Sequence, residues 1–177
     1  KIPPEEIVKK VSKDCNTSSH SLVFILTPTQ SIAGNIQIVS RVSEVGLHKL
    51  HTLKFPLKKV IDVKGSAPIP PIGKDFITAM GRTNDAILYG GEVHLNVKGQ
   101  DNEVKDLAKN LPSSASKDYG KPFADIFRNY KGDFYSIDPN LFSPGKVKVT
   151  SIDTGKTFEE GKINSDLINR SFGYEKN

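Results

Sequence analysis

The chain has 177 residues, of which 36% are hydrophobic and 25% charged, and its formal net charge is +5. These proportions are ordinary for a globular protein with one good core or two small lobes, and no apolar run approaches the roughly 20 residues that cross a bilayer. The positive charge is spread along the chain without the dense runs of Lys and Arg of a nucleic-acid-binding arm, so we expect no nucleic-acid or membrane partner.

The single cysteine and the start of the chain bear on its cellular setting. Cys15 cannot form an internal disulfide, and no Cys and His cluster has zinc-site spacing, so we expect a reducing, cytoplasmic environment and no metal. The charged start lacks the apolar region of a signal peptide. Because the first residue is Lys1 and the only methionine is Met80, we expect an N-terminal region to be absent from this chain.

The first part of the chain predicts a helix, a strand and a second, long helix. Residues 4–14 begin with a proline and two glutamates, which suit a helix N-terminus, and their apolar side chains can face inward. Residues 21–28 are a continuous apolar run that ends at a proline, typical of a buried strand. Residues 31–50 have helical periodicity, with Thr29 or Ser31 as the N-cap. Backbone N–H groups at such a strand-to-helix junction are free to bind an anion or a polar substrate group.

Four polar residues form one narrow stripe along the helix predicted at residues 31–50: Gln37, Arg41, Glu44 and His48. Nine of the other sixteen residues of that helix are apolar, so we expect it to be mostly buried. The Arg–Glu pair has two interpretations. As a structural salt bridge it is commonplace, and an exposed one contributes only about 0.2–0.5 kcal/mol. As a functional pair it is a carboxylate held by a guanidinium at the floor of a polar pocket, and burial distinguishes the two, since buried charges are rarely kept without a partner or a task.

Prolines dominate the next stretch of the chain. Residues 60–63 suggest a short strand, and the four prolines between Pro56 and Pro71 rule out a helix through the rest. Because a Pro-rich connection is stiff and extended, we place a lobe boundary within residues 56–73. Residues 74–80 predict a short helix.

Residues 81–99 predict a β-hairpin. Residues 86–89 and 92–97 are strand-like, and Gly90-Gly91 between them is a hairpin turn signal. Four polar side chains precede the first of these strands: Arg82, Thr83, Asn84 and Asp85. Either they form a turn, since Asn and Asp are frequent turn formers, or they contact a substrate.

The remainder of the chain mixes helices with a hairpin. The predicted elements are an amphipathic helix at 101–111, a Ser-rich loop at 112–122 that could bind an anion, a short helix at 122–130, a hairpin at 146–161 with its turn at 153–156, and a helix at 164–172. This order of elements argues for an α+β or mixed α/β fold and against a doubly wound parallel sheet.

Several kinds of active site are excluded by their missing motifs. The chain has no phosphate-binding loop, no dinucleotide-binding glycine motif, no zinc-protease motif and no serine-hydrolase elbow. What remains is a carboxylate with an Arg partner, the polar segment before residue 86 and several Ser- or Thr-bearing loops. That set suits acid–base chemistry on a small organic substrate without a metal.

Four unusual segments resemble one known family. They are TPTQSIAGNIQIVSRVSEVGLHKL, APIPPIGKDFITAMGRTNDAILYGG, LPSSASKDYGKPFADIFRNYKGDFYSIDPNLFSP and TGKTFEEGKIN. Over nearly its whole length the chain is similar to the methenyltetrahydromethanopterin cyclohydrolases, whose members are longer at the N-terminus. The resemblance implies that residues 1–177 are the C-terminal portion of a two-lobed fold in which helices pack on β-hairpins.

The resemblance also implies a reaction. Water attacks the cationic methenyl carbon of methenyltetrahydromethanopterin, and ring opening gives the formyl derivative, reversibly. This is one-carbon metabolism of methanogenic and related archaea and of some methylotrophic bacteria. Family enzymes are implied to be cytoplasmic homotrimers that use no metal and no redox cofactor, tetrahydromethanopterin itself being the carrier of the substrate.

The family's catalytic Arg and Glu fall on Arg41 and Glu44, where Glu44 activates water and Arg41 positions it. On this hypothesis the substrate-binding residues are Ser31, Gln37, Arg82, Thr83, Asn84, Asp85 and Lys117, with Ser113 and Ser114 beside Lys117 near the anionic tail. Two rival interpretations remain open. The chain is a non-catalytic module that binds an anionic pterin or nucleotide, or it is an inert structural fragment.

Overall fold

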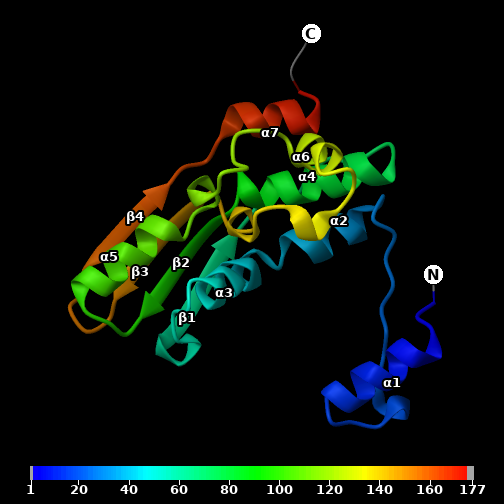
Figure 1. Cartoon of the computed structure of the whole chain (residues 1–177), viewed down its shortest axis with the longest axis horizontal. Helices are drawn as coiled ribbons and strands as arrows, with labels where there is room; N and C mark the ends of the chain where they lie inside the picture. The colour runs from blue at the N-terminus through cyan, green and yellow to red at the C-terminus, as the bar shows by residue number, and fades with distance from the viewer. Residues whose placement is uncertain (1, 175–177) are drawn as a thin grey trace.

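The computed structural model describes residues 2–174 (Figure 1). Within these residues the helices are α1 (Glu5–Asp14), α2 (Ile32–Val39), α3 (Val42–Thr52), α4 (Phe76–Leu88), α5 (Asp101–Asn110), α6 (Phe123–Asn129) and α7 (Ser165–Phe172). The strands are β1 (Val60–Ser66), β2 (Glu92–Val97), β3 (Lys146–Ser151) and β4 (Thr157–Gly161). The prediction of a mixed α/β fold is confirmed. No helix among the described residues combines the length and the apolar character needed to span a membrane.

The four strands form one mixed sheet in the order β1-β2-β3-β4. β1 and β2 are antiparallel, β2 and β3 parallel, and β3 and β4 antiparallel. The doubly wound parallel alternative is thereby excluded. Of the two predicted hairpins only β3–β4 is present, because α4 lies between β1 and β2 in the chain and residues 86–89 are not a strand.

One face of the sheet forms the main core. The inward side chains of the two central strands are fully buried against α3 and α5: Val93, Leu95, Val97, Val147 and Val149. The residues that alternate with them are polar and half-buried, as the two-residue period of a strand requires. A second cluster forms where α4 packs against α6 and α7, and a smaller third one joins Val39 of α2 to Ala86 of α4 and Phe172 of α7. The amphipathic helix predicted at 101–111 is confirmed as α5, with its apolar stripe in the main core.

The predicted helix at 74–80 and the predicted strand at 86–89 are a single helix, α4. Asp75 caps it, since its Oδ1 accepts a hydrogen bond from the Thr78 N–H at 2.7 Å. A short apolar run fits a strand or a buried helix equally by periodicity, and here packing on three neighbouring helices selects the helix. The two glycines that suggested a hairpin turn instead join α4 to β2, with the Gly91 N–H donating to the Ile87 carbonyl.

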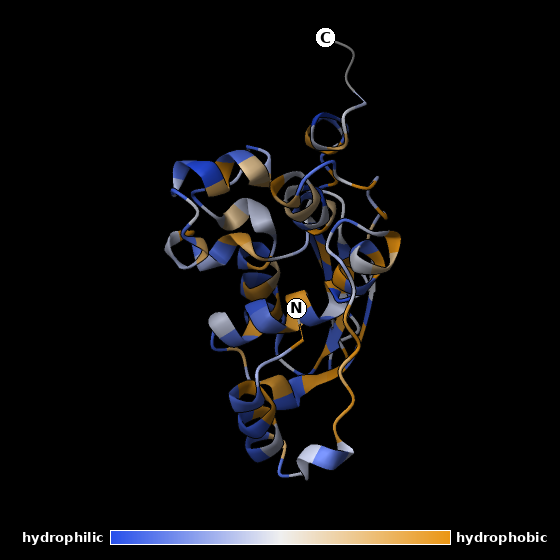
Figure 2. Cartoon of the chain, turned by 90° about the vertical axis from the view of Figure 1, so that its right-hand side faces the viewer, coloured by the Kyte–Doolittle hydropathy of each residue, from blue (hydrophilic) through white to orange (hydrophobic). Residues whose placement is uncertain are grey.

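The prediction of a buried strand at residues 21–28 is wrong. Among the described residues this segment is extended but pairs with no strand, and Val23 and Ile25 are each 87% exposed (Figure 2). The preceding helix is confirmed as α1, but none of its residues is buried, and it lies apart from the sheet in Figure 1. An apolar pattern identifies a segment that can be covered, and no surface within residues 2–174 covers this one.

The predicted helix at 31–50 is two helices. α2 ends at Val39 and α3 begins at Val42, with Ser40 and Arg41 between them. The predicted cap is confirmed, because Ser31 Oγ accepts from the Gly34 N–H at 3.0 Å. The expectation of a mostly buried helix is wrong for α2, whose Ile32 and Ile36 side chains are exposed. The break lets α2 pack on α4 while α3 packs on the sheet.

The C-terminal predictions agree with the structure. The loop after α5 contains only a short 3₁₀ turn (Ser113–Ala115), the turn of the β3–β4 hairpin contains residues 153–156, and α7 is capped by Asn164, whose Oδ1 accepts from the Leu167 N–H. The Pro-rich stretch is extended after β1 and bonded to α2, where Asn35 Nδ2 donates to the Pro70 carbonyl at 2.8 Å. The lobe boundary placed there stays a prediction.

Candidate functional site

Arg41 and Glu44 form a bidentate ion pair at the break between α2 and α3. Arg41 Nε donates to Glu44 Oε2 at 2.7 Å, and Nη2 donates to Oε1 at 2.6 Å. Arg41 occupies the N-cap position of α3 and Glu44 lies in its first turn. The fork of the guanidinium matches the two carboxylate oxygens, which holds the Glu44 side chain in one orientation.

The pair is exposed, with 55% of the Arg41 side chain and 59% of the Glu44 side chain accessible. The expectation that it lies within a buried helix is therefore wrong, and by burial alone it resembles a surface salt bridge. The hydrogen bond from Arg41 lowers the pKa of Glu44, and the same bond raises the pKa of Arg41. The N-terminus of α3 adds favourable positive potential. Glu44 is consequently a carboxylate at neutral pH.

The close approach of β1 to the first turn of α3 positions this region. A Cβ on Gly65 would lie 2.7 Å from Ser43 Oγ and 2.8 Å from Val42 Cγ1, so only glycine allows the contact. The two residues that flank Arg41 in the chain also line a shallow groove of about 350 Å³. Its lining is Ile36, Val39, Ser40, Val42, Gly65, Ser66, Ala67 and Ile69.

The four residues of the predicted polar stripe are exposed on both sides of the helix break. Gln37 in α2 and His48 in α3 are both exposed, as are Arg41 and Glu44. The Ser31 hydroxyl is bonded to the backbone both as acceptor and as donor: Oγ accepts from the Gly34 N–H and donates to the Pro28 carbonyl at 2.6 Å. Gln37 is thus exposed in α2, and Ser31 lies at the start of the same helix.

Residues 82–85 lie within α4 and contact the helices around it. Thr83 and Asp85 are fully buried. Thr83 Oγ1 and Asn84 Nδ2 donate to the Met80 carbonyl, and Arg82 Nε donates to the Ser171 carbonyl at 3.0 Å. The hydrogen bonds of these four side chains go to backbone and to α7, not to the Arg41–Glu44 pair.

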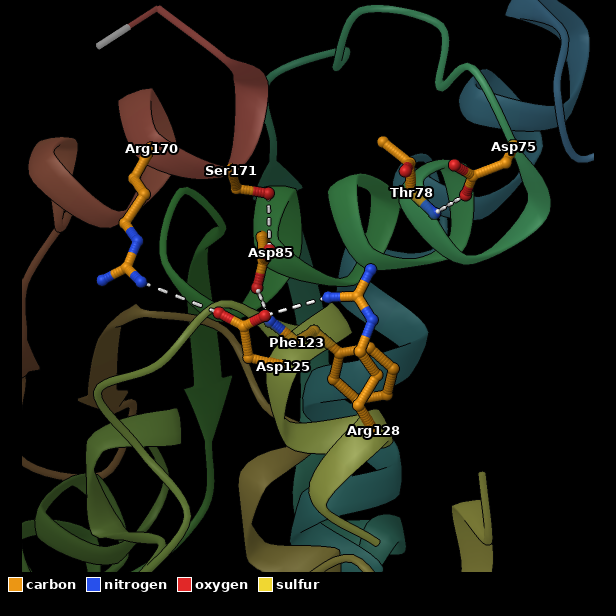
Figure 3. A network of polar contacts seen from close by, with 8 residues as sticks. All are labelled: Asp75, Thr78, Asp85, Phe123, Asp125, Arg128, Arg170 and Ser171. Carbon is orange, nitrogen blue, oxygen red and sulfur yellow. Dashed lines mark hydrogen bonds and ion pairs between the residues drawn. The ribbon is translucent and has the colours of Figure 1, made fainter. Parts of the chain in front are cut away.

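Asp85 is the centre of this buried polar network (Figure 3). Its Oδ1 accepts from the Phe123 N–H at 2.8 Å and its Oδ2 from Ser171 Oγ at 2.5 Å, which joins α4 to α6 and α7. Burial raises the pKa of Asp85 to about 7. Sequence reasoning placed Asp85 in a turn or at a substrate, because the apolar residues after it were assigned to a strand.

The Ser-rich loop divides into buried and exposed side chains. Ser113 is buried, and its Oγ donates to the Leu88 carbonyl at 2.5 Å. Ser114 and Lys117 are exposed, and the Lys117 backbone N–H donates to Asp138 Oδ2 at 3.3 Å. Of the residues predicted to meet an anionic tail, Ser113 therefore serves packing, while Ser114 and Lys117 are open to solvent.

Sequence reasoning missed a buried lysine, Lys49, on α3. The residue is 0% exposed, and burial lowers its pKa to about 8. Its Nζ donates to the backbone carbonyl and to Oδ1 of Asn140. The available signal was its place beside Leu50 on the apolar side of the helix. Among residues 2–174, no group of three or more His, Cys, Asp or Glu side chains is arranged to hold a metal ion.

Comparison with known proteins identifies the family. Residues 1–172 match the family described as "Cyclohydrolase (MCH)". The chain belongs to this cyclohydrolase family. It is 56% identical over 174 residues to the methenyltetrahydromethanopterin cyclohydrolase of Methylobacillus flagellatus, a match that covers 98% of this chain and 53% of the relative.

Two further relatives with the same name extend the comparison. The cyclohydrolase of Methylosinus trichosporium is 55% identical over 171 residues, covering 97% of this chain and 66% of the relative. That of Methanocella arvoryzae is 44% identical over 176 residues, covering 99% of this chain and 55% of the relative. The chain thus spans about half the length of two of these three cyclohydrolases, which come from bacteria and archaea.

Proposed function

We propose that this chain serves the reversible hydrolysis of methenyltetrahydromethanopterin to formyltetrahydromethanopterin. The observation that carries the proposal is the bidentate Arg41–Glu44 pair, which holds an ionised carboxylate at the start of α3 in a chain of the cyclohydrolase family. The substrate is the one in the names of the relatives. Such a reaction needs a base and a positioning group, and the pair supplies both.

In the proposed mechanism Glu44 accepts a proton from water as the water oxygen bonds to the methenyl carbon. The ring C–N bond of the resulting hydroxyl adduct then breaks as its nitrogen takes up the proton from Glu44, and the adduct hydroxyl loses its own proton to solvent to form the formyl carbonyl, so that one proton is released overall. The negative carboxylate also favours the cationic carbon by direct attraction. Arg41 holds the carboxylate in place and keeps it ionised by its hydrogen bonds.

The other predicted site residues stay proposals of unequal support. Gln37 and Lys117 are both exposed, so each can meet a substrate without rearrangement. Ser31 could contact a substrate only through its Oγ, which is already hydrogen-bonded to the backbone. Arg82, Asn84 and especially the buried Thr83 and Asp85 support the fold through their own bonds, which leaves them an indirect role.

The assembly is also part of the proposal. We propose a cytoplasmic homotrimer without metal or redox cofactor, in which a second lobe supplies the other wall of the site. The exposure of Glu44 and the greater length of the relatives support a second wall outside these residues.

Replacing Glu44 by Gln tests the proposed base. We expect Glu44→Gln to lower kcat by about 10²–10⁴-fold, the usual value of general-base catalysis, in hydrolysis followed by ultraviolet absorbance. The free energy of unfolding should change by less than about 1 kcal/mol, because exposed ion pairs contribute little. The matched control is Glu103→Gln on α5, which breaks the ion pair of Glu103 with Lys59 and should leave kcat unchanged. Near-normal turnover of the Glu44 variant would refute the assignment.

A second function, binding of an anionic pterin or nucleotide without catalysis, is favoured by one observation. The carboxylate that would activate water is open to solvent and is not enclosed by described residues. Calorimetric titration of the chain with the methenyl substrate, beside the absorbance assay, separates the two functions. Binding without hydrolysis supports the module, whereas hydrolysis that depends on Glu44 supports the enzyme.

A further inference from the structure

Lys49 is a buried cation that no carboxylate among residues 2–174 contacts directly. Its Nζ donates to the Asn140 backbone carbonyl at 2.7 Å and to Asn140 Oδ1 at 3.0 Å. Asn140 belongs to a 3₁₀ turn, η5 (Pro139–Leu141), far from α3 in the chain. Burial of an ammonium group is unfavourable unless neighbouring dipoles or charges compensate it, so the surroundings of Asn140 decide why this lysine is kept.

The Asn140 side chain lies between Lys49 and a carboxylate. Its Nδ2 donates to Asp138 Oδ1 at 3.1 Å while its Oδ1 accepts from the lysine. The amide dipole is therefore aligned with a positive group at its oxygen and a negative group at its nitrogen. The opposite amide orientation would place N–H groups against the ammonium and an oxygen against the carboxylate, so the two charges fix this one.

Asp138 extends the bridge to the Ser-rich loop. Its second oxygen, Oδ2, accepts from Ser116 Oγ at 2.7 Å and from the Lys117 N–H at 3.3 Å. Its backbone N–H donates to Asp118 Oδ2 at 2.9 Å. A continuous path of hydrogen bonds thus runs from the middle of α3 to the backbone of the turn at residues 116–118.

The two ends of this path are both parts of the proposed site. Glu44 lies in the first turn of α3, and Lys49 follows it by five residues, a rise of about 7.5 Å along the helix. Lys117 is the exposed residue proposed to meet the anionic tail of the substrate. Lys117 lies in a solvent-exposed loop. Without the bridge, fewer contacts would hold this loop in place relative to Glu44.

We infer that Lys49 is a positioning residue: through Asn140 and Asp138 it fixes the 116–118 turn, and with it Lys117, relative to the helix that carries Glu44. The inference rests on the proposed function for the roles of Glu44 and Lys117. A purely structural lysine is the alternative, and the chain offers a comparison. The partly exposed Lys59 donates to Glu103 of α5 at 2.6 Å, and its side-chain hydrogen bonds to described residues do not lead to the loop.

Amide hydrogen exchange of the whole chain tests the bridge without any need for activity. In Lys49→Met we expect the amides of Lys117, Asp138 and Asn140 to exchange about tenfold to a hundredfold faster, the range that hydrogen bonds to a charged group provide. In the control Lys59→Met these amides should keep their rates. If Lys49→Met does not fold, Asn140→Ala should give the same pattern, since it removes the middle of the path. Unchanged exchange at these amides in either folded variant overturns the inference.

Steady-state kinetics then tests what the bridge does for the substrate. We expect Lys49→Met to raise KM for the methenyl substrate about tenfold while kcat falls less, the reverse of Glu44→Gln. Lys59→Met should change neither constant. Faster exchange with an unchanged KM overturns the positioning role and leaves a structural link. Absence of hydrolysis by the unaltered chain instead refutes the proposed function, and with it the substrate role of the bridge.

Discussion

At the scale of single residues, burial shifts the pKa values of two charged groups, whereas a hydrogen-bond partner shifts that of Glu44. Asp85 and Lys49 are both fully buried, and desolvation moves the pKa of each toward the neutral form. Glu44 is exposed, and its pKa falls because Arg41 donates to it. The residue that we propose as the base is therefore the ionised, accessible one.

The raised pKa of Asp85 predicts a particular dependence of stability on pH. The group takes up a proton in the folded state near pH 7 but, once unfolded, only near pH 3.8. The stability it contributes is thus fully present below about pH 4 and is lost as pH rises through 7. In Asp85→Asn the amide oxygen can accept from the Phe123 N–H and the amide N–H can donate to Ser171 Oγ. Relative to that variant, the free energy of unfolding should fall over this window by up to about 4 kcal/mol. Urea denaturation of both proteins at several pH values measures the difference, and a constant difference would contradict the prediction.

At the scale of elements, the break between α2 and α3 is the feature on which the site depends. A continuous helix would point its polar stripe along one line, whereas the break aligns α3 with the sheet and leaves Arg41 at the N-cap. The residues at the break are Ser40 and Arg41, and neither is the proline or glycine that would signal the end of a helix. Gly65 of β1 comes close to Val42 and Ser43 in the first turn of α3, and this tertiary contact supports the geometry of the break.

Two glycine substitutions test this packing. We expect Gly65→Ala to lower the free energy of unfolding by about 1–3 kcal/mol, because the new Cβ would lie 2.8 Å from Val42 Cγ1 and overpack the contact. Gly46→Ala is the matched control within α3, where the nearest atom to a Cβ is Val93 Cγ1 at 3.4 Å. That variant should be neutral or more stable by up to about 1 kcal/mol through helix propensity. Urea denaturation measures both, and equal stability of the Gly65 variant and the parent would refute the packing account.

Prediction of elements succeeded where local signals are sufficient. α5 is specified by Asp and Glu in its first turn, and α7 by a capping Asn. The β3–β4 hairpin is specified by its turn of Asp, Thr, Gly and Lys. It failed for residues 86–89, since a short apolar run has no periodicity of its own. That error carried over to the site, because residues 82–85 were placed before a strand and not within a buried helix.

At the scale of the whole molecule, the described chain has one well-packed body and an N-terminal part that lies outside it. The apolar segment around Val23 is extended and exposed, and α1 has no buried residue (Figure 1). Such exposure of contiguous apolar side chains is uncommon on a protein surface and typical of an interaction region. Because α1 and the most exposed of these side chains bury little surface, we expect them to contribute little to the stability of the described fold.

The same substitution at two valines tests this division. Val23→Ala, at a position 87% exposed, should change the free energy of unfolding by less than about 0.5 kcal/mol. Val93→Ala, at a fully buried position in β2, should lower it by about 1–3 kcal/mol through the cavity it leaves. Thermal or urea unfolding of the two variants measures the contrast. A comparable loss at Val23 would mean that the N-terminal part is packed into the body in solution.

The sequence by itself determined the family, the mixed α/β class and the identity of the Arg–Glu pair, because these depend on residue types at short spacings. Tertiary structure alone decided that the long helix breaks at Arg41, that Asp85 is buried while Glu44 is exposed, and that Lys49 reaches Asn140. The physical reason is common to all of these. Periodicity constrains the backbone over a few residues, whereas exposure and long-range hydrogen bonds depend on which surfaces the rest of the chain brings against each side chain.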